Sequence, residues 1–159
     1  AIPPLIEEVT GISDAMVADA PPFEAVADTV AALLEGCVFV AHSARFDFGF
    51  IKNAFTRIGR EFAAPVLCTV KLSRALFPEH HRHGLDALIE RHGLVCAARH
   101  RAMGDVEVLW QFVRGLEAGF APEVLARAAA RAMKAPAQPP GLPEGMLEAL
   151  PDALPISVV

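Results

Sequence analysis

The chain has 159 residues, of which 53% are hydrophobic, and its formal net charge is −5. This length and composition suit one domain with a sizeable core and exclude a disordered chain. No uncharged apolar run reaches the roughly 18 residues of a membrane span, so we expect no membrane association. The start, Ala1 to Pro4, lacks the basic and apolar regions of a signal peptide, and we expect the chain to be cut from a longer one.

Apolar residues at helical spacing, bounded by proline and glycine, predict a chain of mostly helices with two short strands. The expected elements are helices at 5–12, 13–18 and 21–36, a strand at 37–41, a helix at 46–58, a strand at 65–69, and helices at 70–76, 85–92, 102–118 and 122–134. The β-branched run 37–41 reads as a strand buried on both faces, as in a parallel sheet. The alternation indicates an α/β domain at 1–134. Six prolines at 136–155 predict a linker or tail at 135–159.

Three cysteines, Cys37, Cys68 and Cys96, are spaced too widely for a zinc knuckle or a redox pair. Free cysteine is usually buried, so we expect structural thiols. An odd number without a disulfide framework indicates the reducing cytoplasm.

Basic residues concentrate in the middle of this acidic chain. Residues 1–44 have seven acids and no Lys or Arg, whereas residues 45–101 have ten Lys or Arg against five acids. The basic third is either an electrostatic footprint for phosphates or the solvated face of ordinary helices. Within it, the run 80–83 (His-His-Arg-His) could suggest zinc, but adjacent histidines cannot easily face one ion. An exposed basic loop that approaches phosphates is the favoured interpretation.

Two short strings carry the chemistry. One runs from His42 to Asp47 after the strand at 37–41, and the other runs from His100 to Asp105 at the start of a helix. Asp47 shares a helical face with Ile51 and is expected to be buried, which a helix N-terminus, a basic partner or a metal ion would relieve. A purely structural N-cap is the alternative for Asp47. His100 suits a general base, because histidine changes charge near neutral pH.

In order and spacing, these strings resemble the second and third motifs of the DEDDh exonucleases, which are 3′–5′ exonucleases of the RNase H-like fold. The similarity is greatest to the proofreading epsilon type of bacterial DNA polymerase III and spans residues 5–118. The second motif usually reads His-Asn-x-x-Phe-Asp, and Ser43 replaces that Asn here. Val9 to Ile12 resembles the family's loop near the substrate 3′ end. The first motif, Asp-x-Glu, is missing, since the only such string is Asp105 to Glu107.

The resemblance implies a two-metal phosphodiester hydrolysis that uses Mg²⁺ or Mn²⁺. Asp105 would ligate a metal, Asp47 would support the second ion, and His100 would take the proton from the attacking water. Residues expected to meet nucleic acid are Thr10, Gly11, His42, Ser43, Arg45, Phe46 and Arg101. Because the first motif is missing, we expect a partial exonuclease domain whose incomplete sheet lacks its opening strands.

Three functions stay open at this stage. The first is hydrolysis of single-stranded DNA from its 3′ end in proofreading, with a DNA polymerase subunit as a possible partner, although the fragment itself would be inactive. The second is an RNA-end exonuclease. The third is a non-catalytic remnant that binds nucleic acid or a protein partner.

Overall fold

The computed structural model describes residues 1–98 and 100–133, so the predicted tail at 135–159 lies outside the described residues. The elements, in chain order, are α1 (Pro4–Thr10), α2 (Asp14–Val17), α3 (Phe23–Leu34), β1 (Phe39–Ala41), α4 (Arg45–Arg57), β2 (Val66–Cys68), α5 (Thr69–Leu76), α6 (Leu85–His92), α7 (Ala102–Gly119) and α8 (Pro122–Ala132). The expected α/β order is confirmed. None of the described helices combines the length and apolarity that a membrane crossing requires.

Proline and glycine set several of the helix ends, as the sequence predicts. Prolines stand in the first turns of α1 and α8, where a missing N–H is no loss. Gly11 ends α1 with a φ of 65°, and Gly93 ends α6 with a φ of 61°. Both glycines adopt the left-handed conformation that other residues enter at a cost.

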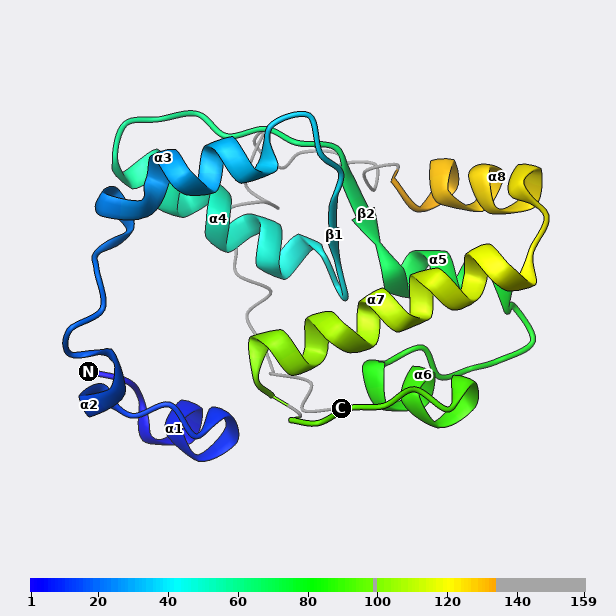
Figure 1. The fold of residues 1–159 in the computed structure, drawn as a ribbon, viewed down its shortest axis with the longest axis horizontal. Coiled ribbons are helices and arrows are strands. Elements are labelled where there is room, and N and C mark those ends of the chain that lie inside the picture. Colours follow the sequence, from blue (N-terminus) through cyan, green and yellow to red (C-terminus); the bar gives the residue numbers. More distant parts are fainter. Residues whose placement is uncertain (99, 134–159) are drawn as a thin grey trace, which may run out of the picture.

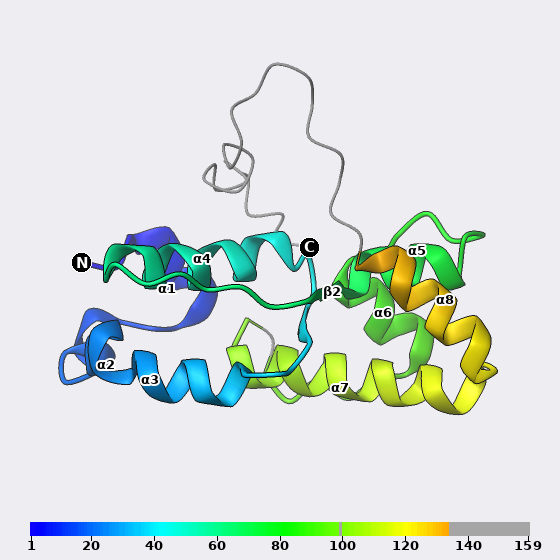
Figure 2. The same ribbon diagram turned by 90° about the horizontal axis from the view of Figure 1, so that it is seen from above.

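The two strands form a parallel pair in which Phe39 faces Val66 and Ala41 faces Cys68. Figures 1 and 2 show α3 and α4 on one side of this pair and α5, α6 and α8 on the other. The expectation that residues 37–41 are buried on both faces is wrong, because Val38 is 45% exposed and Val40 is 40% exposed. Strand β1 pairs with β2 along one edge only, and its other edge has no strand beside it among the described residues.

Each side of the strand pair has its own packed group of side chains. Beyond β2, Leu72, Leu88, Phe112 and Leu116 join α5, α6 and α7, with Ala128 and Ala132 of α8 against them. On the other side, Phe55 of α4 stacks on Phe62 at 4.9 Å between ring centroids and meets Phe23 of α3 edge-on at 5.0 Å. Full burial of one such side chain contributes roughly 1.5–3 kcal/mol, so these two groups fix the positions of α7 and α4.

The predicted apolar stripes of α4 and α7 are only partly buried. Phe55 is 1% exposed, but Phe46 and Phe50 on the same helix are 45% and 56% exposed. In α7, Leu109 and Leu116 are buried as expected, whereas Met103, Val106 and Trp110 are exposed. Both helices carry apolar residues on more than one face, and in the described residues only one face of each has a packing partner.

The cysteines also differ from the expectation of buried thiols. Cys37 is exposed, and Cys68 and Cys96 are half-buried. All three are unpaired, as an odd number without a framework predicts.

We expect the chain alone to self-associate through the open edge of β1, because an unpaired apolar strand edge is a template for another strand. Val40→Lys places a charge on this edge and should shift the population toward monomer in size-exclusion chromatography with light scattering. Val124→Lys is the matched control, since Val124 has a similar exposure, 41%, on α8. A wild-type chain that is monomeric and melts cooperatively would contradict this prediction.

Candidate active site

The first string turns the chain sharply from β1 into α4. Strand β1 ends at Ala41, and α4 begins at Arg45 with Asp47 in its first turn. Between them, Ser43 has a φ of 58°, in the left-handed region. Asn enters that region more readily than Ser, which gives a backbone reason for the Asn of the usual motif.

His42 ties the ends of the two strands together. Its Nδ1 lies 2.9 Å from Oγ1 of Thr69, and that hydroxyl donates to the Ala41 carbonyl at 3.3 Å. Since the hydroxyl proton is used in this way, Nδ1–H of His42 is the donor to Thr69. Thr69 is fully buried at the start of α5. The sequence alone did not identify Thr69 as a partner of His42. Its position directly after the second strand could have suggested that it lies near the end of the first one. The role of His42 toward nucleic acid stays a prediction.

The second string forms the entry to α7. His100 is half-buried in a turn with a φ of 63°, and Arg101 is the N-cap residue. The Arg101 carbonyl accepts a hydrogen bond from the Asp105 N–H at 3.0 Å. Asp105 therefore stands in the first turn of α7, as Asp47 does in α4.

The two carboxylates lie within electrostatic reach of each other. Burial raises the pKa of the Asp47 carboxyl, its own backbone N–H opposes this, and the negative charge of Asp105 raises that pKa further. The expectation that Asp47 is buried with the apolar face of α4 is wrong, because the residue as a whole is exposed beside half-buried Ile51. Its carboxyl nevertheless has enough protein around it to lose part of its hydration. The fold thus brings the two strings together at their acidic ends.

This pair fits a divalent cation chemically, although it is short of a full site. Carboxylate oxygens are preferred ligands of Mg²⁺ and Mn²⁺, and a cation would relieve the repulsion between two neighbouring carboxylates. Within residues 1–98 and 100–133, no group of three or more His, Cys, Asp or Glu side chains gathers in a way that could hold a metal. Asp47 and Asp105 alone therefore do not make a complete metal site in the described residues, and their role as metal ligands stays a prediction.

The remaining predicted residues fall into two groups. Thr10 and Gly11 end α1, and Arg101 donates from Nη2 to the Gly11 carbonyl at 3.3 Å, so the α1 end reaches the second string. Phe46 is exposed next to Asp47, and its ring meets Phe50 edge-on at 4.8 Å. Arg45 is exposed at the start of α4.

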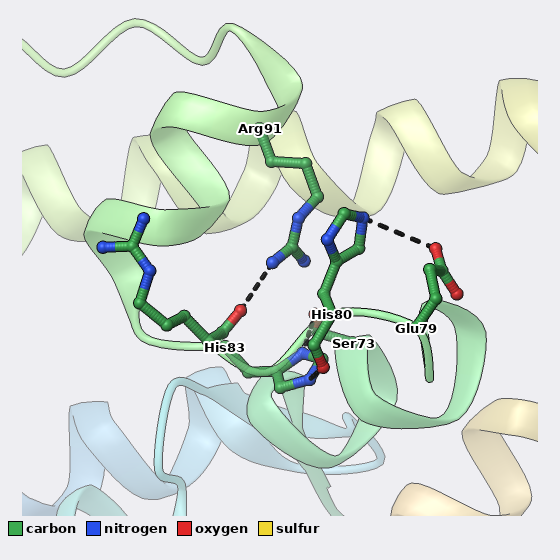
Figure 3. A network of polar contacts seen from close by, with 6 residues as sticks. Ser73, Glu79, His80, His83 and Arg91 are labelled. Atoms are coloured by element: carbon green, nitrogen blue, oxygen red, sulfur yellow. Dashed lines mark hydrogen bonds and ion pairs between the residues drawn. The ribbon is translucent and has the colours of Figure 1, made fainter.

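The histidine-rich run 80–83 is not simply the exposed basic loop that was expected. His83 is only 8% exposed; its Nε2–H donates to the His80 carbonyl at 2.9 Å, and its Nδ1 lies 2.8 Å from the buried Ser73 hydroxyl. Figure 3 shows this network, with the His80 ring directed at Glu79 and Arg91 directed at the Arg82 carbonyl. A buried hydroxyl needs a partner, so His83 is a structural histidine.

Comparison with known proteins supports the reading of the two strings. A sequence family described as Exonuclease matches residues 1–112, which include both strings and the α1 end. The chain belongs to this exonuclease family. The predicted resemblance to the DEDDh exonucleases is thereby confirmed.

Two relatives share similar portions of the chain. The 3′-5′ exonuclease DinG of Bacillus subtilis is 45% identical over 109 residues, or 68% of this chain and 12% of that protein. The DNA polymerase III subunit epsilon-like protein of Rhodobacter capsulatus is 43% identical over 106 residues, or 65% of this chain and 15% of that protein. The chain thus spans a small part of the length of these relatives.

A solved structure is similar across most of the fold. It is that of Exonuclease X in complex with 5′ overhanging duplex DNA, with a TM-score of 0.58 and 27% identity. The match covers 80% of this chain and 74% of that chain. It supports the RNase H-like exonuclease fold that the resemblance implies.

His83→Ala should lower the free energy of unfolding by about 1–3 kcal/mol, because it leaves the buried Ser73 hydroxyl without its partner. Denaturant unfolding measures this loss. His81→Ala is the matched control, since the exposed His81 lies two residues away, and it should change stability little. Equal effects of the two substitutions would show that His83 has no special structural role.

Burial and the charge of Asp105 should keep the pKa of the Asp47 carboxyl above its ordinary value, and Asp105→Asn should lower that pKa, measured from the carboxyl carbon shift by NMR. Because the folded chain then holds this proton more tightly than the unfolded chain, the free energy of unfolding falls as pH rises through the raised pKa. Asp47→Asn should remove that fall. Asp19→Asn, an exposed residue after α2, is the control. If the pKa of Asp47 is the same in Asp105→Asn as in the wild-type chain, the two strings do not lie close together.

Proposed function

We propose that this chain supplies part of a metal-dependent exonuclease site that removes nucleotides from the 3′ end of single-stranded DNA. The proposal is carried by the two motif carboxylates, Asp47 and Asp105, which each lie in the first turn of a helix and are near enough that the charge of Asp105 adds to the effect of burial on the Asp47 pKa. Two neighbouring carboxylates repel each other unless a proton or a cation lies between them, so the pair is suited to holding a metal ion.

Asp47 and Asp105 would hold Mg²⁺ or Mn²⁺, and the bound ion would stabilise the charge that develops on the phosphate during hydrolysis. Both carboxylates lie in the first turn of their helices, where the helix dipoles of α4 and α7 partly offset the two negative charges. His100 is the general base, which accepts the proton of the attacking water at a ring nitrogen. His100 is half-buried in the turn before α7, five residues ahead of Asp105 in the same string, which supports this role.

The side chains around the acidic pair suit a nucleic-acid strand. Phe46 is an exposed aromatic beside Asp47, and such rings stack on bases whatever their sequence. Arg45 adds positive charge at the same end of α4 for the phosphate backbone. The similarity to an epsilon-like protein supports a DNA polymerase subunit as partner, and the unpaired thiols are consistent with the cytoplasm.

Residues 1–159 alone should not degrade a 5′-labelled DNA strand with Mg²⁺ or Mn²⁺, because two carboxylates do not make a two-metal site. A longer chain, in which a β-strand carrying Asp-x-Glu is added ahead of Ile2, should shorten the labelled DNA from its 3′ end. The control is the same longer chain with the Asp and the Glu of the added β-strand both replaced by Ala. An RNA strand of the same sequence, tested in parallel, decides the sugar preference.

In this restored chain, His100→Ala should lower the rate about a hundredfold or more, as expected for a lost general base. Metal binding by calorimetry should survive in His100→Ala. Asp105→Asn should weaken metal binding and rate together, and His81→Ala should change neither. A restored chain that keeps its rate with His100→Ala, or robust cutting by residues 1–159 alone, would overturn the assigned roles.

A further inference from the structure

The N-terminal residues form a small folded unit in which no side chain is fully buried. We call residues 2–17, with α1 and α2, the α1–α2 unit; neither helix contains a buried residue. The unit is held together locally. The Ile2 N–H donates to the Asp14 carboxylate at 2.7 Å, and the Thr10 hydroxyl donates to the Ile6 carbonyl at 2.7 Å and accepts from the Ile12 N–H at 3.2 Å. Its apolar residues Ile2, Ile6, Val9 and Ile12 are only half-buried, so hydrophobic burial holds the unit less firmly than it holds the helices that carry fully buried residues.

Arg101 reaches across to this unit from the entry of α7. Its Nη2 donates to the Gly11 carbonyl at 3.3 Å, and a Cβ built on Gly11 would lie 3.6 Å from the same nitrogen. The guanidinium therefore lies directly against the turn that ends α1. The Arg101 backbone carbonyl meanwhile accepts the first hydrogen bond of α7, from the Asp105 N–H. Arg101 thus contacts the Thr10–Gly11 turn through its side chain and the Asp105 N–H through its backbone carbonyl. It also follows His100 directly in the sequence.

We infer that Arg101 is a positioning residue that docks the α1–α2 unit onto the end of α7 that carries His100 and Asp105. The sequence alone had suggested that Arg101 meets nucleic acid, but in the structure its guanidinium contacts a protein carbonyl. This part of the inference rests on the proposed function. The docking would hold the Thr10–Gly11 turn beside Asp47 and Asp105, where the 3′ end of the DNA would lie. Arg101 then acts on the strand through that turn rather than through a phosphate.

Hydrogen exchange of the chain itself tests the docking without any nuclease activity. In Arg101→Ala, the protection of the Gly11 and Ile12 amides should fall about tenfold, the effect of losing one charge-assisted hydrogen bond. Arg101→Lys keeps a cationic donor and should restore part of this protection. Arg127→Ala, on the exposed face of α8, is the matched control and should change nothing. Unchanged protection at 11–12 in Arg101→Ala, or an equal loss throughout α5, α7 and α8, would overturn the inference.

Binding of a 5′-labelled single-stranded DNA, followed by anisotropy across a range of salt, separates positioning from phosphate contact. Positioning predicts weaker binding by Arg101→Ala with an unchanged salt dependence. A phosphate contact would lower the slope of log K against log salt by about one and would overturn the inference.

Gly11→Ala strains the turn itself, because Gly11 has a φ of 65°. It should lower the protection of the Gly11 and Ile12 amides whether or not Arg101 is present, so it serves as the positive control for loss of the turn. If the wild-type chain binds no DNA, the proposed function fails while the exchange result still decides the role of Arg101.

Discussion

The arrangement depends on one electrostatic constraint: the Asp47 carboxyl is partly buried, which raises its pKa, and the negative charge of Asp105 on a separate helix raises that pKa further. Asp47 and Asp105 stand in the first turns of α4 and α7, at the positive ends of the two helix dipoles. Helix N-termini stabilise each negative charge alone but do not remove the repulsion between the two. A fold that holds such a pair opposes its own electrostatics, and pairs of this kind gather where a cation or a proton is handled.

Two separately packed groups hold the pair in place. Phe23, Phe55 and Phe62 fix α4 on one side, and Leu88, Phe112 and Leu116 fix α7 on the other. The β1–β2 pair joins the two sides, and the hydrogen bond from His42 to Thr69 locks the ends of both strands next to the first turn of α4. The candidate site therefore lies at the junction of the two groups, and a shift of either one would change the separation of the carboxylates.

Local chemistry made most of the elements predictable. Pro4 and Pro122 mark helix starts, Gly11 and Gly93 mark helix ends, and their φ preferences act within a few residues. The choice of buried face was less predictable, because periodicity shows which face is apolar but not which face has a partner. Val106 and Trp110 are apolar yet exposed, whereas His83 is polar yet buried against Ser73. The approach of Asp47 to Asp105 depends on how α4 and α7 pack, which the local sequence does not show. It was predicted only from the resemblance of the two strings to the family's motifs.

The central claim is that these two strings form one cation site. Paramagnetic broadening by Mn²⁺, followed in the amide spectrum of the chain at neutral pH, tests it most directly. The account predicts that the amides around Asp47 and around Asp105 broaden together at the lowest Mn²⁺ concentrations, and that Asp47→Asn weakens the effect at both places. Broadening confined to the His80–His83 run, or at one carboxylate without the other, would contradict it.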